Sequence, residues 1–150
     1  MATLAAGDAT ALVLFAAIGR LSHGEGLALG DLAATALPFL LGWALTAPFL
    51  GAFSVEARGH DVGAATAAAA KSWAVATPVS LLFRAVSQGR APPVAFAVVS
   101  FVVTGALLVA WRAAAAAQAP KRDRRAAATQ NRVGNPLEFL TLLTGLVKRW

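Results

Sequence analysis

The charged residues that border or enter apolar stretches of the chain are the ones whose position could support chemistry. These residues are Asp8, Arg20, Lys71 and Arg84. A charge at the centre of a lipid bilayer costs about 2.5–3.5 kcal/mol on insertion scales. Such a residue therefore either pairs with an opposite charge or serves a proton or ion path. Because each of these residues lies within a few turns of a predicted helix end, structural pairing is favoured.

The expected pairs follow from the side of the membrane towards which each charge is predicted to lie. Asp8 is predicted to pair with Lys71 on one side. On the opposite side, Arg20 or Arg84 is predicted to pair with an acid that is nearby in the sequence. The candidate acids are Glu25 and Asp31.

The two histidines, His23 and His60, lie in loops that are predicted to face opposite sides of the membrane. Either imidazole could ligate a tetrapyrrole if the chain belongs to a pigment complex, although a solvated loop histidine is the more common arrangement. With two histidines and no cysteine, a dedicated metal site is not expected. No cofactor is assigned; chlorophyll, carotenoid or lipid are the candidates within a photosynthetic complex.

No pattern of residues indicates an enzyme. The chain has no glycine-rich phosphate loop, no His-Glu-x-x-His and no nucleophile elbow. Its seven acidic residues lie mostly in predicted turns, which gives little support to a catalytic pair of carboxylates. We therefore expect a protein without catalytic activity.

Long apolar stretches must position these residues, and they indicate a membrane protein. Of the 150 residues, 58% are hydrophobic and 13% are charged, whereas a soluble domain carries about 25% charged residues. About 20 apolar residues cross a bilayer as a helix. We predict an all-α membrane domain, residues 1–112, built as a bundle of four transmembrane helices. The predicted spans cover about 4–21, 32–53, 62–86 and 94–111.

The second and third predicted spans depart from a simple apolar helix. Pro38 and Pro48 lie inside the second, which we expect to be one bent helix because membrane helices tolerate proline. The third begins with an alanine-rich part and contains Lys71 and Pro78. Alanine favours a helix but anchors poorly in lipid. The third span is therefore expected to depend on neighbouring protein.

A basic linker is predicted over residues 113–134. Much of the excess behind the net charge of +6 lies there. The basic residues expected to contact a partner or the membrane surface are Lys121, Arg122, Arg124 and Arg125. Membrane headgroups or an acidic protein fit this linker better than nucleic acid does. By the positive-inside rule, the linker places both termini on the cytoplasmic or stromal side.

An amphipathic helix is predicted over residues 135–150. Asn135 and Pro136 provide an N-cap and a proline at the first helical position. The apolar side includes Phe139, Leu143, Leu146 and Trp150. Such a helix is expected to lie on the membrane surface or on a partner.

Several short motifs resemble a known family of small membrane proteins. They are Gly7-Asp8, Ile18-Gly19-Arg20 with Ser22-His23-Gly24, Pro38 to Trp43, the Pro78 span that ends in Arg84, and Trp111-Arg112. Over residues 4–112 they resemble the domain of unknown function DUF3054. The resemblance implies four spans and no particular activity. From the sequence alone, Trp111 and Arg112 are predicted to form an interfacial anchor, with the cation reaching towards the headgroups.

The extension beyond Arg112 resembles that of a family member from a photosynthetic eukaryote. It favours a chloroplast thylakoid membrane, with a bacterial plasma membrane as the second expectation. We expect an accessory subunit of a larger membrane protein complex, with other membrane subunits and the bilayer as partners. The alternatives are a small transporter or channel that works as an oligomer, and a pigment- or lipid-binding membrane protein.

Overall fold

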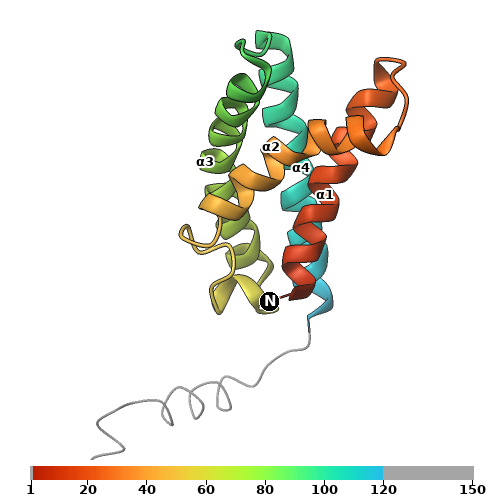
Figure 1. Cartoon of the computed structure of the whole chain (residues 1–150). Coiled ribbons are helices and arrows are strands. Elements are labelled where there is room, and N and C mark those ends of the chain that lie inside the picture. Colours follow the sequence, from red (N-terminus) through yellow and green to blue (C-terminus); the bar gives the residue numbers. More distant parts are fainter. Residues whose placement is uncertain (1, 120–150) are drawn as a thin grey trace, which may run out of the picture. The chain divides into compact units, whose positions relative to one another are not determined.

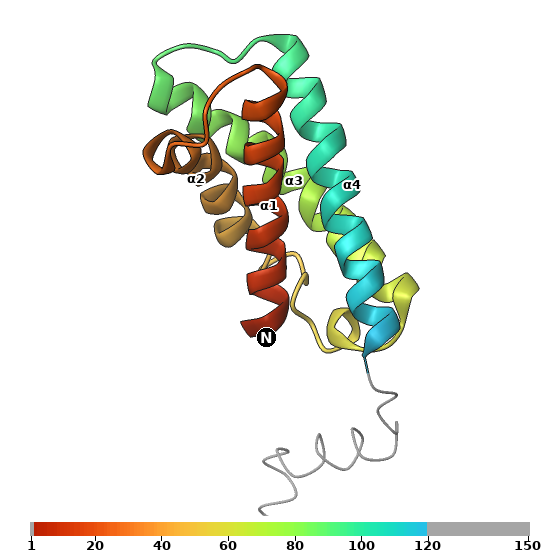
Figure 2. The ribbon, with the colours of Figure 1, turned by 90° about the vertical axis from the view of Figure 1, so that its right-hand side faces the viewer.

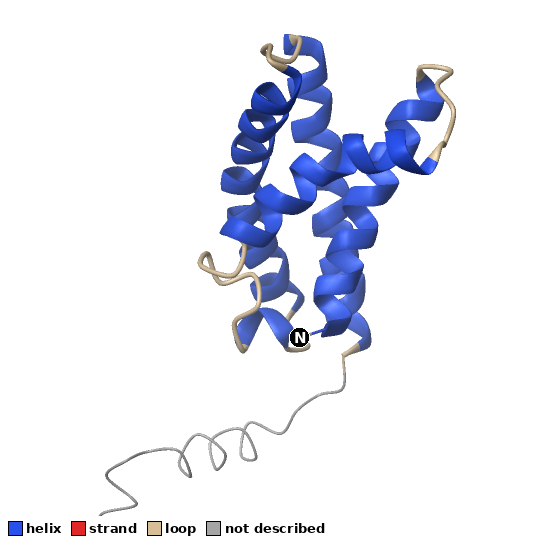
Figure 3. Ribbon diagram, viewed as in Figure 1, coloured by secondary structure: helices blue, strands red, loops and turns tan. Residues whose placement is uncertain are grey.

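The computed structural model describes residues 2–119, and throughout that range the regular elements are helices, with no strand. Figures 1 and 3 show their arrangement. The elements are α1 (Ala2–Ser22), α2 (Leu29–Thr46), the short 3-10 helix η1 (Glu56–Arg58), α3 (Val62–Gln88) and α4 (Val94–Gln118). The predicted amphipathic helix and the basic residues of the linker lie outside the described residues.

Three of the helices are long and apolar enough to cross a membrane, namely α1, α2 and α4. The 27 residues of α3 exceed the length needed for a crossing. Its alanine-rich first half and Lys71 lower its apolarity, and α3 is not among the candidate spans. The all-α prediction is confirmed, whereas a fourth span stays a prediction.

The ends of α3 are set by specific side-chain and backbone chemistry. At its start, the Asp61 carboxylate accepts a hydrogen bond from the Ala64 N–H at 3.0 Å, which satisfies a free donor of the first turn. At its end, Gly89 adopts a left-handed conformation with φ of 63°. The Gly89 N–H returns to the carbonyls of Ala85 and Val86, as in a glycine C-cap.

The helix α2 is shorter than the sequence suggested. It ends at Thr46, so the expected single bent helix reaching residue 53 is wrong. Pro38 is accommodated inside α2, but Pro48 has no N–H to continue the ladder, and Gly51 turns the chain with φ of 84°. Residues 47–53 therefore form turns that bring the chain back towards the bundle axis.

The four helices pack as a bundle in which α1 contacts α2 and α4, and α3 contacts the same two helices. The start of α1 and the end of α4 lie at one end of the bundle, as Figure 2 also shows. The core between the helices includes Phe15, Phe39, Trp43 and Leu108. The rings of Phe15 and Phe39 meet edge to face with centroids 4.9 Å apart.

A close approach of α2 and α3 depends on Gly42. A Cβ atom added at this position would lie 2.1 Å from the Ser80 Oγ and 2.9 Å from the Ala76 carbonyl oxygen. The second of these neighbours is backbone and cannot rotate away. Glycine is therefore needed for the two helices to pack at this distance.

Candidate functional site: a buried ion pair

Asp8 and Arg112 form an ion pair in the interior of the bundle, with both side chains fully buried. The Arg112 Nε donates to Asp8 Oδ1 at 2.7 Å, and Arg112 Nη2 donates to Asp8 Oδ2 at 2.5 Å. This two-point contact is the strongest arrangement of a guanidinium and a carboxylate. It joins the first turns of α1 to the last turns of α4 across 104 positions of sequence.

Further groups make hydrogen bonds to the remaining polar atoms of the pair. Trp43 Nε1 donates to Asp8 Oδ2 at 3.1 Å, which ties α2 to the carboxylate. Arg112 Nη1 donates to the Ala52 carbonyl at 2.6 Å, and the guanidinium lies 5.0 Å from the centroid of the Phe53 ring. One buried site thus connects α1, α2, α4 and the turns that follow α2.

The structure corrects two expectations about this region. The partner of Asp8 is Arg112, whereas Lys71 is exposed and lies elsewhere. Arg112 is also not an interfacial anchor, because it is 1% exposed. The physical reason is that α4 continues to Gln118 through the alanine tract, which places Arg112 inside the helix, facing α1.

The neighbouring residues Gly7 and Trp111 dock against each other beside the pair. A Cβ on Gly7 would lie 1.9 Å from Trp111 Cζ2, so the absence of a side chain makes room for the indole. The dipeptides Gly7-Asp8 and Trp111-Arg112 therefore form one contact. Both dipeptides are among the motifs that carry the family resemblance, and this shared membership is the one sequence signal that points to their contact.

The charges at the opposite end of the bundle are arranged around Arg20. Its Nη1 lies 3.0 Å from Glu25 Oε2, and its Nη2 lies 3.2 Å from Asp31 Oδ2. The structure thus brings together three of the four residues that were expected to pair there. Arg84 instead lies over the ring of Phe96, 4.4 Å from its centroid.

The remaining candidate ligands are on the surface. His23 and His60 are both exposed. His23 follows α1 in the loop before α2, and His60 lies in the loop between η1 and α3. Within residues 2–119, no group of acidic or histidine side chains could hold a metal ion.

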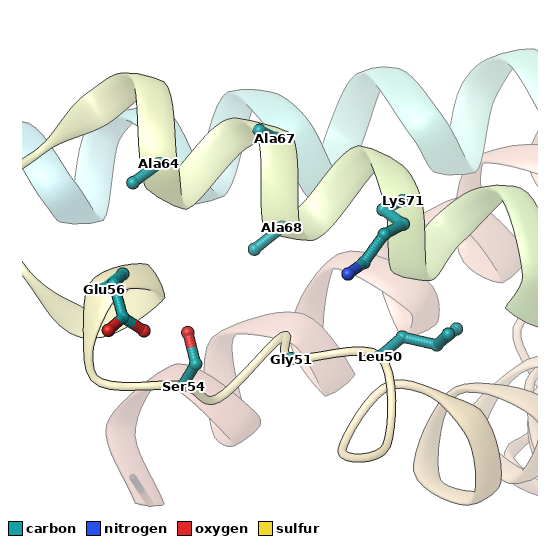
Figure 4. A pocket seen from close by; sticks show the side chains of 8 residues that line it. All are labelled: Leu50, Gly51, Ser54, Glu56, Ala64, Ala67, Ala68 and Lys71. Carbon is teal, nitrogen blue, oxygen red and sulfur yellow. The ribbon is translucent and has the colours of Figure 1, made fainter.

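A groove of about 380 Å³ lies at the end of the bundle where α3 begins. Figure 4 shows its lining side chains. They are Leu50, Gly51, Ser54, Glu56, Ala64, Ala67, Ala68 and Lys71. The groove separates α3 from the turns after α2, and it is where the structure places Lys71.

These features define the class of the protein as an all-α, membrane-type helical bundle held by a buried Asp–Arg pair. More particularly, the chain belongs to the family described as Protein of unknown function (DUF3054), whose model matches residues 5–115. This confirms the resemblance seen in the sequence, and the matched range contains both members of the ion pair. No curated protein and no solved structure matches the chain.

Proposed function

We propose that the protein crosses the membrane four times, with α3 as the additional span and both termini on the cytoplasmic or stromal side. The described ends of α1 and α4 lie together at one end of the bundle, which agrees with an even number of crossings. At 1.5 Å per residue, α3 is about 40 Å long, so it exceeds the hydrocarbon core. Contacts with α2 and α4 supply the protein neighbours that its low apolarity requires.

We further propose that the protein is a non-catalytic subunit of a larger membrane protein complex. The observation that carries this proposal is that its buried charges satisfy each other. Among residues 2–119, Asp8 and Arg112 are the buried charged residues, and their polar atoms are used in holding helices together. Because the polar atoms of this site are already used in hydrogen bonds between helices, we favour a scaffold that acts through its outer surface.

The outer surface of α4 offers a suitable place for a partner helix. Ala106, Ala110 and Ala114 are exposed and follow one another at intervals of four residues. Small residues at this spacing allow the backbones of two membrane helices to approach closely. Towards the start of α4 the same line of exposed residues continues with the larger Val98 and Val102, and α1 exposes large side chains such as Leu14 and Ile18.

Single cysteines test this proposal directly, because the native chain contains none. Ala110→Cys should form crosslinks to another protein in native membranes, whereas Leu14→Cys on α1 should not. Purification in mild detergent should recover the same partner. A chain that crosslinks only to its own copies, or that runs as a free monomer, would contradict a role as a subunit of a mixed complex.

A small transporter or channel is the second candidate, favoured by polar side chains buried along α3 and α4. They are Ser72, Thr77, Ser80, Ser100 and Thr104. Thr77 and Thr104 lie 3.4 Å apart, while Ser72 Oγ and Ser100 Oγ have no hydrogen-bond partner within the described residues. Proton flux into liposomes containing the purified protein, reduced by Ser100→Ala, would support this candidate over the subunit.

The thylakoid membrane is our proposed location, supported by the family-like extension beyond Arg112 noted in the sequence. Fractionation of the native source tests it, and recovery in a bacterial plasma membrane would contradict it.

Pigment binding through His23 or His60 is the third candidate. It predicts visible absorbance in the purified protein that His23→Ala or His60→Ala removes.

A further inference from the structure

The groove beside α3 combines an apolar wall with a charge near each end. Alanine side chains of α3 form one side of the groove. Leu50 lies across the groove from α3, at the end where Lys71 lies (Figure 4). Lys71 extends its ammonium into the groove, while Glu56 lies at the end near Ala64. Within residues 2–119, neither Lys71 nor Glu56 takes part in an ion pair. The groove therefore presents one positive and one negative group to a ligand.

The two charges follow each other along the helix axis in a fixed order. Ala64 and Lys71 are about 10 Å apart along α3 at 1.5 Å per residue. Lys71 is about 13 Å from the first residue of α3, whereas Glu56 belongs to η1, outside the helix. If α3 crosses the membrane, Lys71 lies deeper than Glu56. Beyond Lys71, the exposed side of α3 continues with Ala74, Val75 and Pro78.

The groups of a glycerophospholipid with an amino headgroup occur in the same order. The acyl chains are deepest, the phosphate follows, and a primary ammonium is outermost. We propose that the groove binds such a zwitterionic phospholipid, with its phosphate at Lys71 and its ammonium at Glu56. The acyl chains then follow the exposed side of α3 past Ala74 and Pro78. This inference rests on the proposed crossing by α3 and does not depend on a partner subunit. It applies to the bacterial plasma membrane, the second expected location, because thylakoid membranes contain galactolipids and phosphatidylglycerol in place of amino phospholipids.

The local chemistry of Glu56 suits it to bind a cation. Hydrogen bonds from its own backbone N–H and from the Ser54 hydroxyl lower the pKa of Glu56, and the nearby Arg58 contributes in the same direction. Its carboxylate therefore stays charged at neutral pH. A primary ammonium can donate hydrogen bonds to it.

Other common phospholipids match the groove less well. A choline headgroup has no N–H to donate to Glu56, and it is larger than a primary ammonium. A glycerol headgroup leaves the lipid with a net negative charge, which Glu56 repels. The charge pattern thus selects the amino headgroup over both.

Native mass spectrometry of the delipidated full chain in detergent tests the selection. The probes are phosphatidylethanolamine, phosphatidylcholine and phosphatidylglycerol with identical acyl chains. We expect phosphatidylethanolamine to bind roughly tenfold more tightly than the other two, as expected for one added hydrogen bond between charged groups. Equal binding of all three lipids, or strongest binding of phosphatidylglycerol, would overturn the proposal.

Variants assign the two contacts. Glu56→Gln should remove the preference for phosphatidylethanolamine over phosphatidylcholine, and Lys71→Gln should weaken the binding of all three lipids. Arg90→Gln, in the exposed loop at the opposite end of the bundle, is the matched control and should change neither. Lys71→Arg keeps a cation that binds phosphate, so it should retain binding even if Lys71→Gln folds poorly. Unchanged lipid binding in both Glu56→Gln and Lys71→Gln would refute the site.

A separate measurement distinguishes failure of this inference from failure of the proposed topology. Cysteine labelling from each side of sealed vesicles reports whether the two ends of α3 lie on opposite sides. If they lie on the same side, the premise of a membrane-embedded groove is removed. If they lie on opposite sides and the lipids bind equally, the lipid site alone is wrong.

Discussion

The pairing of Asp8 with Arg112 places two ionised side chains where neither contacts solvent. Desolvation of two charges is expensive, and the mutual attraction offsets it only when hydrogen bonds satisfy the remaining polar atoms. Trp43 and the Ala52 carbonyl provide those bonds here. The pair therefore acts mainly by fixing how the helices pack against one another. Loss of either residue leaves an uncompensated buried charge.

We predict that Asp8→Ala lowers the free energy of unfolding by about 3–5 kcal/mol, because Arg112 then remains charged without its partner. Asp31→Ala is the matched control at the Arg20 pair, where the Asp31 side chain is 65% exposed, and it should cost at most about 1 kcal/mol. Unfolding of the purified protein in mixed detergent micelles measures both. A double variant with Asp8→Leu and Arg112→Met should be more stable than Asp8→Ala; a further loss would contradict the charge argument.

We predict that Gly42→Ala destabilises the bundle by about 1–3 kcal/mol, because its Cβ meets the backbone of α3. Gly19→Ala is the control, since a Cβ at Gly19 would have no neighbour within 4 Å. Alanine is the better helix former, so this variant should gain roughly 0.5–1 kcal/mol. The same unfolding assay compares the two, and equal effects would show that close packing at Gly42 is not needed.

Asp8 was correctly predicted from the sequence to form a structural ion pair, but the predicted partner, Lys71, is wrong, because the structure pairs Asp8 with Arg112. In the sequence, Lys71 lies within a predicted span, whereas Arg112 ends one, and this pattern favours Lys71 as the partner. Which cation faces inward depends on the rotation of α4 and on the length of its alanine extension. Local composition predicts neither the rotation of α4 nor the length of its extension. The dipeptide motifs Gly7-Asp8 and Trp111-Arg112 were the one sequence signal that indicated the contact.

Among the four helices, α3 is the one that is not a candidate span, so the proposal that it crosses the membrane depends most on its neighbours. Its first half is alanine-rich, and it contains Lys71 and Pro78. We predict that isolated α3 inserts poorly in a glycosylation-based insertion assay, whereas isolated α4 inserts efficiently. Lys71→Leu should raise the inserted fraction of α3, by about 1–3 kcal/mol in apparent free energy. Efficient insertion of unmodified α3 would show that it needs no neighbours.

The helix boundaries show where sequence signals were sufficient. Asp61 and Gly89 delimit α3 by capping, and the third predicted span ended two residues before its observed last residue, Gln88. The end of α2 was missed because two prolines, Pro38 and Pro48, look alike in sequence. The first is accommodated inside a helix that packs on neighbours, while the second is followed by Gly51 in a left-handed conformation.

For the molecule as a whole, the arrangement of helix ends predicts its topology in the membrane. Single cysteines at Thr3 and Gln118 should react with an impermeant maleimide from the same side of sealed vesicles. A cysteine at Gln88, at the far end of α3, should react from the other side. Labelling of Gln88→Cys together with Thr3→Cys would contradict four crossings.

The number and order of the helices could be predicted because apolar stretches alternate with short polar turns. The assembly of those helices could not, because it depends on close approaches such as Gly42 on α3 and Gly7 on Trp111. The groove was also hidden, since it forms only when the turns after α2 come alongside the start of α3.

The separation of Asp8 and Arg112 in the sequence has a consequence for how the protein is made. A ribosome completes α1, α2 and α3 before Arg112 is synthesised, so the nascent chain carries Asp8 without its cation throughout that time. The last helix therefore closes the assembly, and a chain truncated before α4 retains an unmatched acid near its first helix turns. The truncated chain thus carries an uncompensated charge that the finished chain neutralises.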